Sequence, residues 1–305
     1  MTYFLIRRVF GGFISLTVIA FIVFFLLRAL PGGPFDQEKS LPPEIIKNIE
    51  AYYGLDKPLW QQFTTYVYNA VRGDLGVSYT QRDLPVTELI KSKVVVSAEL
   101  GVYSMIFAIL LGIPLGVLAA YHHNSVFDYA ASFFAIIGRS IPNMALAPML
   151  ALFFGLFLQW VPVARWTTWD SKILPTIALG LGSAAFIARL TRSSMLQVIR
   201  DDFIRTARAK GLSEMTVMFQ HALRNALLPV ITIIGPIFAY TLTGTLVIER
   251  IFAIPGLGYY FVVSISNRDY PVVVGVYLLL GFVIILMNTI VDVLYAIVDP
   301  RIRLI

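Results

Sequence analysis

The sequence has no cysteine and only three histidines in 305 residues. Disulfide bonds and thiolate chemistry are therefore excluded, although this decides nothing about the compartment. His122, His123 and His221 have no acidic neighbour at ligand spacing, so no metal site is expected. No Gly-Lys pair occurs in the chain, which excludes a phosphate-binding loop ending in Gly-Lys-Ser or Gly-Lys-Thr. No nucleophile–base pair is legible either, so we expect no catalytic residue. Any ATP-driven work must come from a partner, because the chain lacks the phosphate-binding loop.

Charged residues are also scarce: they make up 14% of the chain, against about a quarter in an average soluble domain. Hydrophobic residues make up 58%, and the mean hydropathy is +0.77. A bilayer core of about 30 Å requires roughly 20 apolar residues per helix, so the long apolar runs predict membrane spans. The sequence therefore predicts an all-α integral membrane protein with about six transmembrane helices. The expected spans lie near residues 9–30, 97–120, 130–158, 173–198, 228–249 and 273–298.

The first apolar run is preceded by Arg7 and Arg8, as in a signal peptide. The run from Val9 to Leu27 is longer than the apolar core of about 7–15 residues in a signal peptide, and no small-x-small cleavage site follows it. We therefore interpret residues 1–30 as a cytoplasmic N-terminal segment and a retained first span.

The balance of Lys and Arg in the short loops orients the spans. With a cytoplasmic N-terminus and six spans, the C-terminus is cytoplasmic as well, and the inner loops then carry more positive charge than the outer ones. The inner set is Arg7, Arg8, Arg200, Arg205, Arg208, Lys210, Arg224, Arg301 and Arg303, and the outer set is Arg165, Lys172, Arg250 and Arg268. This bias accounts for most of the net charge of +6, which needs no nucleic-acid partner.

Residues 31–96 are expected to fold as an external helical cap on the remaining five-helix core at 97–305. Pro42-Pro43 opens one helical stretch and Pro58 a second, and the turn-rich run that follows becomes helical into the second span. Aromatic side chains supply surface to bury, which argues against a disordered linker. They are Tyr52, Tyr53, Trp60, Phe63, Tyr66, Tyr68 and Tyr79.

A polar island at residues 201–229 interrupts the later spans. It reads DDFIRTARAKGLSEMTVMFQHALRNALLP and is rich in Arg and Lys. Gly211 can adopt the left-handed conformation that ends a helix, and Ser213 can cap the next helix. We predict a cytoplasmic helix–turn–helix that a partner grips; the alternative is an ordinary basic loop. Apolar residues recur in the island at near-helical spacing and form one predicted stripe. They are Ala207, Ala209, Leu212, Met215, Met218, Phe219 and Leu223.

This island resembles the cytoplasmic coupling loop of permease subunits in binding-protein-dependent ATP-binding-cassette (ABC) importers. Arg205-Thr206-Ala207 stands where the family has Glu-Ala-Ala, and Gly211 matches the motif glycine. The generic Ile-x-Leu-Pro falls on His221-Ala222-Leu223-Arg224, where the proline is absent. Both departures are similar to the oligopeptide and dipeptide branch. Other runs resemble the B-type permease of that branch: FLIRRVFGGFISLTVIAFIVFFLLRALPGGPF, LPPEIIKNIEAYYGLDKPL, GDLGVSY, VIERIFAIPGLG, NRDYP and IVDVLYAIVDPRIR.

The resemblance implies a type I importer permease (MetI-like) fold in a bacterial cytoplasmic membrane, and transport of oligopeptides by alternating access. The implied partners are a homologous C-type permease, an external solute-binding protein and two ATPase subunits that hold ATP and Mg. It implies no cofactor bound to this chain itself. The residues implied to couple it to the ATPases are Arg205, Thr206, Ala207, Arg208, Ala209, Lys210, Gly211, Leu212, Ser213, His221 and Arg224.

Polar residues at membrane depth are candidates for the translocation path, because they need a wet or paired environment. Arg139 lies in an apolar run, and Pro142 interrupts the helical hydrogen-bond ladder beside it. A path-lining role and a buried ion pair fit Arg139 equally well. The candidates are Arg139, Ser140, Asn143, Thr241, Thr243 and Thr245.

Two other interpretations stay open. The same architecture can carry dipeptides, glutathione, nickel chelates or sugars, since the external binding protein sets most of the selectivity. An ion-coupled secondary transporter would need carboxylates near the membrane midplane and an internal repeat. Glu99 and Asp292 lie at or in the spans, but no convincing repeat is legible and Asp292 is close to the cytoplasmic edge. ATP dependence of uptake distinguishes the two mechanisms.

Overall fold

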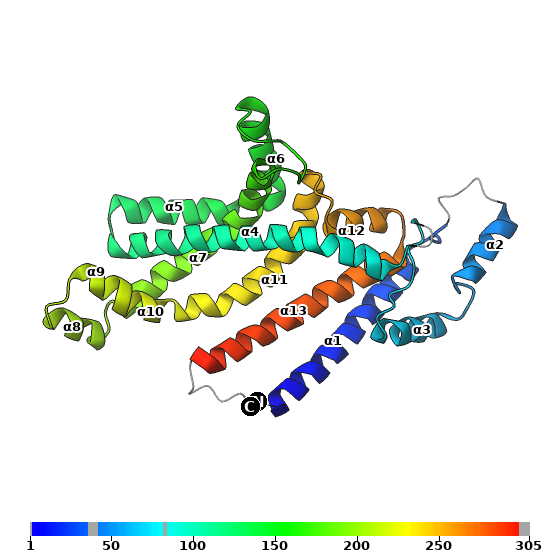
Figure 1. The fold of residues 1–305 in the computed structure, drawn as a ribbon, viewed down its shortest axis with the longest axis horizontal. Coiled ribbons are helices and arrows are strands. Elements are labelled where there is room, and N and C mark those ends of the chain that lie inside the picture. The colour runs from blue at the N-terminus through cyan, green and yellow to red at the C-terminus, as the bar shows by residue number, and fades with distance from the viewer. Residues whose placement is uncertain (1, 36–41, 82–83, 299–305) are drawn as a thin grey trace. The chain divides into compact units, whose positions relative to one another are not determined.

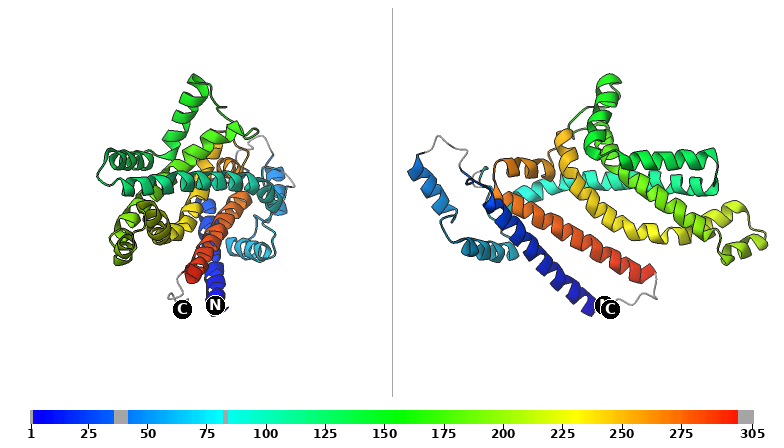
Figure 2. Two further views of the ribbon diagram at one scale, coloured as in Figure 1. Left: turned by 60° about the vertical axis from the view of Figure 1, so that its left-hand side comes forward. Right: turned by 180° about the vertical axis from the view of Figure 1, so that it is seen from behind.

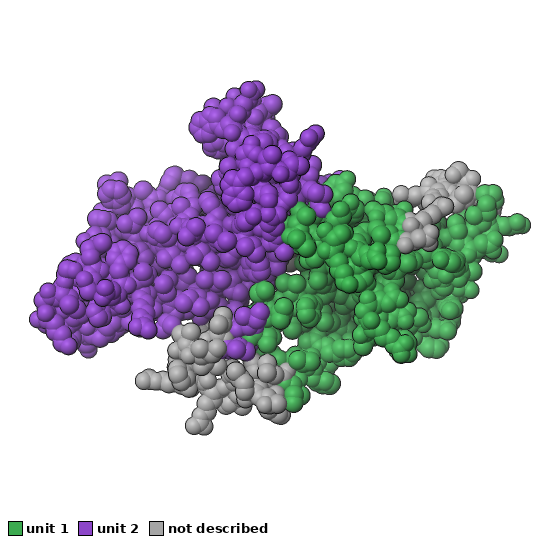
Figure 3. Space-filling model, viewed as in Figure 1, with its two compact units in different colours: residues 1–96, 256–289, 303–305 green, residues 97–255, 290–302 purple. Residues whose placement is uncertain are grey.

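The computed structural model describes residues 2–35, 42–81 and 84–298, and there the secondary structure is helix and turn apart from one isolated bridge between Val77 and Pro85. The helices form two compact units (Figures 1 and 3). Unit 1 comprises residues 1–96, 256–289 and 303–305, and unit 2 comprises residues 97–255 and 290–302. Two long helices therefore contribute to both units.

Unit 1 is built on two long helices that run side by side, α1 and α13 (Figures 1 and 2). A methyl group on Gly12 of α1 would lie 3.1 Å from a side-chain carbon of Ile285, and one on Gly281 of α13 would lie 3.0 Å from Leu16. These glycines let the helices touch closely, as small residues do in membranes. The helices of unit 1 are α1 (Thr2–Ala29), α2 (Pro43–Tyr52), α3 (Leu59–Val71), the start of α4 (Val86–Tyr121), α12 (Leu257–Ser266) and most of α13 (Tyr270–Val298).

The two short helices of the predicted cap begin at prolines, as the sequence indicates. Pro42 is the N-cap of α2, which has Pro43 in its first turn, and Pro58 is the N-cap of α3. Proline suits these positions because the first turn has no helical partner for its N–H groups, and the ring fixes φ near the helical value. The helix starts are therefore determined locally.

The cap aromatics pack only in part. Phe63 of α3 meets Phe21 and Phe24 of α1 edge-on, with ring centroids 5.5 and 5.4 Å apart. Tyr53 and Tyr79 lie against the ring of Phe35, a residue that the sequence analysis did not single out. Burial is thus concentrated on the side of the cap that faces α1. The side chains of Tyr52, Trp60 and Tyr68 remain exposed.

A buried carboxylate holds the loop before α4 in place. Asp269, immediately before α13, is fully buried and accepts hydrogen bonds from the Thr80 hydroxyl at 2.7 Å and from the backbone N–H groups of Tyr79 and Thr80 at 3.1 and 3.3 Å. The Ser78 hydroxyl donates to the same carboxylate. A buried charge is tolerated only when its acceptor sites are satisfied, and these donors satisfy it. The sequence analysis gave Asp269 no such role.

Unit 2 is organised around α7, which packs against α5, α6, α10 and α11. A core cluster of Ala108, Ala184, Ile187 and Val230 joins α4, α7 and α11. Besides the rest of α4, the elements are α5 (Val126–Ser140), α6 (Asn143–Leu150), the π-helix η1 (Ala151–Phe157), the 3₁₀ turn η2 (Asp170–Lys172), α7 (Ile173–Val198), α8 (Asp202–Ala209), α9 (Glu214–Thr216), the π-helix η3 (Val217–Ala222), α10 (Leu223–Ala226) and α11 (Leu228–Ile251).

Glycines bring α4 and α7 into backbone contact. A methyl group on Gly116 would lie 2.5 Å from the carbonyl oxygen of Ala188, and one on Gly112 would lie 2.7 Å from that of Ala184. On α7, a methyl group on Gly180 would lie 2.6 Å from the carbonyl oxygen of Ser104. Backbone oxygens cannot rotate away as a side-chain end can, so these positions admit only glycine without a shift of the helices.

The spans agree with the predicted number, with one correction. Four helices are long and apolar enough to cross a membrane, and two bent helix pairs raise the number to six, within the described residues. The stretch near 130–158 is not one continuous helix, because α5 and the α6–η1 helix meet at an angle of 104°. Ile141 is extended there, with φ −87° and ψ 117°, since the residue before a proline is displaced from the helical region. Pro142 then starts α6.

Replacing Gly116 by alanine is expected to lower the thermal stability of the purified chain in detergent. The added methyl group meets backbone atoms of α7, and overpacking of this kind costs on the order of 1–3 kcal/mol. Gly11→Ala is the matched control, because a methyl group at Gly11 of α1 has nothing within 4 Å. Equal melting temperatures for the two variants would refute the close contact between α4 and α7.

Candidate functional site

The polar island folds as the predicted helix–turn–helix at one end of unit 2 (Figure 1). α8 ends at Ala209, Lys210 is its C-cap, and Gly211 has φ +78° with open space around it. The Ser213 hydroxyl caps the following helix by accepting a hydrogen bond from the backbone N–H of Thr216 at 3.3 Å. The left-handed Gly211 and the Ser213 cap are both confirmed. The second helix runs through α9, η3 and α10 without a break.

One side of this helix–turn–helix packs against the ends of α4 and α7. Ile204 of α8 and Val217 of η3 are fully buried. They share a cluster with Met195 of α7 and with Val117 and Ala120 of α4. The helices are thus bodies packed on the spans, not a loose loop. The other buried members from the island are Ala207, Met218, Ala222 and Ala226.

The predicted apolar stripe is divided between two faces. Met218 is buried in the cluster and Leu223 packs against it, but Met215 and Phe219 are exposed, at 60% and 49%. The periodicity is helical, but the π-helical turn and the break at Gly211 rotate neighbouring apolar positions to different sides. Large apolar side chains exposed on these helices therefore form an outward face, which is typical of a docking surface. They are Phe203, Leu212, Met215 and Phe219.

The arginines of the island differ in their ion-pair partners and in how strongly they are paired. Arg208 spans the turn and makes two hydrogen bonds with Glu214, Nε–Oε1 at 2.8 Å and Nη2–Oε2 at 3.2 Å. Arg205 contacts Asp202 at 3.3 Å, but both side chains are largely exposed, and such pairs are worth about 0–1 kcal/mol. Arg208 thus helps to close the turn, while Arg205 is available to a partner.

The remaining predicted coupling residues lie on the same helices. The Thr206 hydroxyl donates back to the carbonyl of Asp202 at 2.9 Å. His221 is half-buried, and its carbonyl accepts a hydrogen bond from the Asn225 amide at 2.9 Å. Ala209, Lys210 and Arg224 are exposed. The structure thus brings all of the predicted set onto one helix–turn–helix, with Ala207 as its buried member.

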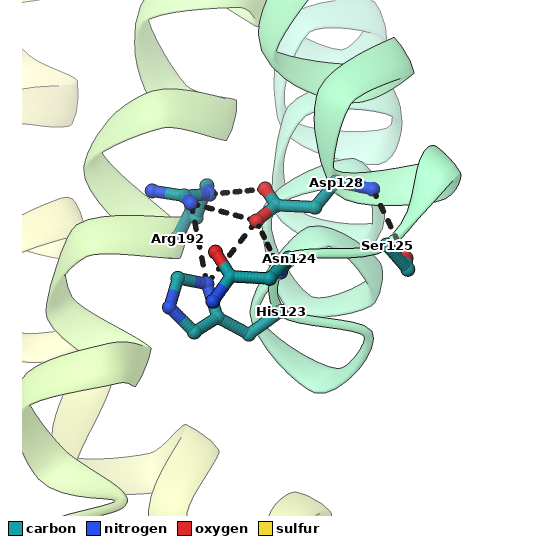
Figure 4. Close-up of polar contacts among 5 residues, drawn as sticks. All are labelled: His123, Asn124, Ser125, Asp128 and Arg192. Carbon is teal, nitrogen blue, oxygen red and sulfur yellow. Dashed lines mark hydrogen bonds and ion pairs between the residues drawn. The ribbon is translucent and has the colours of Figure 1, made fainter.

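A buried ion pair joins α5 to α7 (Figure 4). Asp128, at the start of α5, is only 2% exposed, and Arg192 of α7 binds it with Nε–Oδ1 at 2.5 Å and Nη2–Oδ2 at 2.8 Å. The backbone N–H of Asn124 donates to Asp128 at 3.0 Å, and His123 Nδ1 lies 3.1 Å from the same carboxylate. Two-pronged pairing of a guanidinium with a carboxylate is among the strongest and most directional polar contacts.

The ion pair fixes the turn between α4 and α5 to α7. Met195, in the core cluster under the helix–turn–helix, lies one helical turn beyond Arg192. Ala120, another member of that cluster, lies in the last turn of α4, just before the turn that carries His123. The polar network and the apolar cluster therefore hold the same two helix ends.

The sequence analysis missed this network. It considered acidic neighbours of the histidines only at metal-ligand spacing, and so did not predict the contact between His123 and Asp128. The signal available was Ser125-x-x-Asp128, a capping pattern before an apolar run. In the structure the Ser125 hydroxyl accepts from the backbone N–H of Asp128 at 3.4 Å. The pattern predicts the start of α5, but not the partner on α7. No metal-ligand cluster is found among the described residues.

The path candidates from the third span gather at the break between α5 and α6. The Arg139 guanidinium lies 4.9 Å from the ring centroid of Phe186 on α7, and the Asn143 side chain is the neighbour of Gly182 on the same helix. Ser140 is exposed, and its hydroxyl donates to the carbonyl of Ile136 at 2.8 Å. Arg139 is itself exposed, so the structure does not support a buried ion pair for it.

Two of the threonine candidates on α11, Thr241 and Thr245, are buried. The Thr241 hydroxyl donates to the carbonyl of Ile237 at 2.8 Å and lies 3.4 Å from the Ser183 hydroxyl of α7. The Thr245 hydroxyl donates to the carbonyl of Leu242 at 2.7 Å. Their polar groups are thus satisfied by their own helix. The side chain of Thr243 lies outside the described residues.

Glu99, weighed as a proton-coupling residue, lies in a structural network. It accepts hydrogen bonds from Lys172 Nζ at 2.6 Å, the Tyr103 hydroxyl at 2.8 Å and Trp166 Nε1 at 2.8 Å. The Lys172 ammonium also lies within 6 Å of three aromatic ring centroids. A carboxylate with these partners ties α4 to the segment before α7, which weakens the secondary-transporter hypothesis.

Comparison with known proteins covers nearly the whole chain. The family sequence model "Binding-protein-dependent transport system inner membrane component" matches residues 112–304, and "Binding-prot-dependent transport system membrane comp, N-term" matches residues 1–97. The "Oligopeptide transport system permease protein OppB" of Haemophilus influenzae is 44% identical over 99% of this chain and 100% of its own length. The "Dipeptide transport system permease protein DppB" of Bacillus subtilis is 44% identical over 100% of this chain and 99% of its own length.

Solved structures give the same fold. A chain of "Inward facing conformations of the MetNI methionine ABC transporter" has a TM-score of 0.56 at 20% identity, covering 69% of this chain and 96% of that one. A chain of "an amino acid ABC transporter with histidines" has a TM-score of 0.53 at 17% identity, covering 71% of this chain and 95% of that one. The expected MetI-like fold is confirmed, and at these identities the likeness concerns the fold alone.

Arg192→Met is expected to destabilise the chain by about 3 kcal/mol, because it leaves the buried Asp128 carboxylate without its main partner. Arg205→Met is the control, since its pair with Asp202 is exposed and worth at most about 1 kcal/mol. Unfolding of the purified variants in detergent measures both changes.

The double variant Asp128→Asn/Arg192→Met completes the cycle. We expect it to be less destabilised than the sum of its two single variants, because the second change removes the charge that the first left unpaired. Strict additivity would mean that the two side chains do not interact in solution.

Proposed function

Because the chain belongs to the binding-protein-dependent transport system inner membrane component family, we propose that it is the membrane-spanning permease subunit of an ATP-driven peptide importer. The observation that carries the proposal is the helix–turn–helix at residues 202–226, which is sealed to the core on one side and exposes apolar and basic side chains on the other. A subunit without a phosphate-binding loop needs such a surface, because a partner's work must enter through it.

The packing of the helix–turn–helix at residues 202–226 gives it the rigidity that transmission of a partner's movement requires. Closure of the ATPase subunits pushes on residues 205–223, and the contacts of Ile204 and Val217 pass the displacement to the ends of α4 and α7. The Asp128–Arg192 pair makes those two ends move as one body. Packed helices shift as units, whereas a flexible loop would absorb the displacement. The spans then open outward, peptide enters, and hydrolysis restores the inward-open state.

The proposed assembly has five subunits. This chain pairs with a homologous C-type permease, two ATPases bind at the coupling surface, and an external solute-binding protein delivers cargo. ATP and Mg reside on the ATPases, so this subunit is non-catalytic and binds no cofactor itself. The family description, which names both a binding protein and an inner membrane component, supports this arrangement.

The proposed cargo is a peptide. The relatives named for oligopeptide and for dipeptide transport are equally similar, at 44% identity each, so peptide length is decided by experiment and not by likeness. The oligopeptide assignment is retained because PGGPFDQEKSLPPE at residues 31–44 resembles that branch. Competition between labelled dipeptides and longer peptides for uptake tests it, and dominance of the dipeptide would reverse the assignment.

The proposed path follows the break between α5 and α6. Arg139, Ser140 and Asn143 lie there near residues 182–186 of α7, so polar groups and freed backbone gather at one depth. Thr241 and Thr245 join the path only when α7 and α11 separate, because their hydroxyls are buried in this conformation. Contact with peptide backbone suits a carrier of many sequences.

The proposed topology places both termini in the cytoplasm and the cap at residues 31–96 outside the cytoplasmic membrane. A chain without cysteine allows a direct test, since any introduced thiol is the sole target. We expect Tyr68→Cys to react with a membrane-impermeant maleimide in spheroplasts, and Lys210→Cys to react only in inverted vesicles. Both side chains are exposed, so accessibility differs only through the membrane. Labelling of both from the same side would overturn the topology.

Gly211→Val is expected to reduce uptake about tenfold, because a β-branched residue resists positive φ at a cost on the order of 1–2 kcal/mol. Gly73→Val is a closely matched control: Gly73 also has positive φ, at +86°, and open space, but lies in the cap. Uptake by reconstituted vesicles and ATP hydrolysis are measured together. We expect Gly211→Val to hydrolyse ATP without transport, and Gly73→Val to transport normally. Normal uptake by Gly211→Val would refute the role of the turn.

The assembly itself is tested by purifying the tagged chain from native membranes. Recovery of a second permease and two ATPases supports the proposal, and Phe219→Asp should lose the ATPases while keeping the permease partner, because Phe219 is exposed on the coupling surface. Recovery of the chain alone, with uptake that needs no ATP, would establish a secondary transporter instead.

A further inference from the structure

Two cavities of unit 1 meet at shared residues. The first has a volume of about 530 Å³ and lies among the C-terminal end of α1, the α2–α3 turn and the start of α13. The second has a volume of about 420 Å³ and lies among α1, α3 and α13 further along the spans. Tyr66 and Leu75 line both cavities. The two cavities therefore adjoin at these residues, and their linings differ in chemistry.

The first cavity is suited to an anion. Arg28 and Lys57 line it, and none of its lining residues is acidic. Arg28 Nε donates to the Gln62 side-chain oxygen at 3.1 Å, and the guanidinium lies 3.5 Å from the ring centroid of Phe24. No described carboxylate pairs with Arg28. A half-buried guanidinium held by a neutral amide and a ring keeps its charge available for a ligand.

The second cavity is suited to a hydrocarbon chain. Phe13, Leu16 and Ala20 of α1 face Leu278 and Phe282 of α13 across it. Thr17 contributes the one hydroxyl from α1 to this cavity. This hydroxyl already donates a hydrogen bond to the carbonyl of Phe13 at 2.9 Å. These residues belong to the segments that are long and apolar enough to cross a membrane. The apolar cavity thus lies at membrane depth, while Arg28 marks the end of the same segment.

Tyr66 connects the two ends. Its hydroxyl is buried and has no hydrogen-bond partner among the described residues. A buried hydroxyl without a partner is unfavourable in a native protein, so such a group calls for a ligand or an ordered water that accepts its proton. Its place at the junction is where a molecule filling both cavities would change from polar to apolar.

We propose that these cavities bind one anionic phospholipid of the outer leaflet. The phosphate lies against Arg28 and Lys57, the Tyr66 hydroxyl donates to an ester or phosphate oxygen, and an acyl chain follows the groove between α1 and α13. Charge and shape both select this occupant: a short peptide or a free phosphate satisfies the first cavity but leaves the second empty. The lipid fastens α3, and with it the cap, to the first and last spans.

The test measures lipid retained by the purified full-length chain. The chain is reconstituted in vesicles of phosphatidylglycerol or of phosphatidylcholine, extracted in mild detergent, and examined by native mass spectrometry. We expect one retained phosphatidylglycerol and about tenfold less phosphatidylcholine, the ratio that corresponds to one charge-assisted contact. Equal retention of the two lipids would overturn the proposal.

Variants separate the two ends of the site. Arg28→Gln should lower phosphatidylglycerol retention about tenfold. Arg72→Gln should leave it unchanged, because Arg72, the C-cap of α3, is exposed and lines neither cavity. Ala70→Trp fills the apolar cavity and should lower retention of both lipids. If Arg28→Gln retains lipid as the unchanged chain does, no anion site exists here.

Tyr66→Phe supplies a readout that a misfolded variant cannot imitate. In phosphatidylcholine it should be as stable as the unchanged chain or more stable, because it removes a partnerless hydroxyl. In phosphatidylglycerol it should gain less thermal stability than the unchanged chain. Equal gains would exclude the hydroxyl contact. Displacement of the lipid by inorganic phosphate or by a cargo peptide at millimolar concentration would assign the first cavity to those ligands and overturn the lipid assignment.

Discussion

Direct contact between the backbones of α4 and α7 is the constraint on which unit 2 depends. In a membrane, burying apolar surface between helices gains nothing over lipid, so association rests on close packing and polar contacts. Gly112, Gly116 and Gly180 permit the necessary approach. The approach brings the far ends of both helices together, and there Asp128 meets Arg192 and the core cluster forms. The helix–turn–helix at residues 202–226 packs on these joined ends.

Two of the buried carboxylates, Asp128 and Asp269, are stabilised in different ways. Asp128 is neutralised by a guanidinium from another helix, which fixes both distance and direction. Asp269 is surrounded by hydroxyl and backbone donors of the loop at residues 78–80. The first arrangement joins α5 directly to α7. The second arrangement fixes the conformation of the loop at residues 78–80, because its donors all converge on the Asp269 carboxylate.

Local signals in the sequence predicted local structure well. The prolines at residues 42, 43, 58 and 142, together with Gly211 and Ser213, each impose a backbone preference that needs no distant partner. Apolar runs predicted the spans because membrane thickness sets their length. The sequence did not predict that Met218 is buried and Phe219 exposed, because the side of the helix that packs on α4 and α7 is decided by tertiary contacts. Nor were the partners of Asp128 and Asp269, which lie 64 and about 190 residues away in the sequence.

The division into units has a consequence for biosynthesis. Unit 2 is, apart from residues 290–302, an insertion between the two main parts of unit 1, so most of its contacts can form before residues 256–289 exist. At about 5–20 residues per second, the loop at residues 78–80 waits on the order of 10–40 s for Asp269 to be made. Its hydroxyls have no carboxylate to bind during that interval. The loop at residues 78–80 therefore completes its native contacts only after the segment that begins α13 has been synthesised, although most of unit 2 is made earlier.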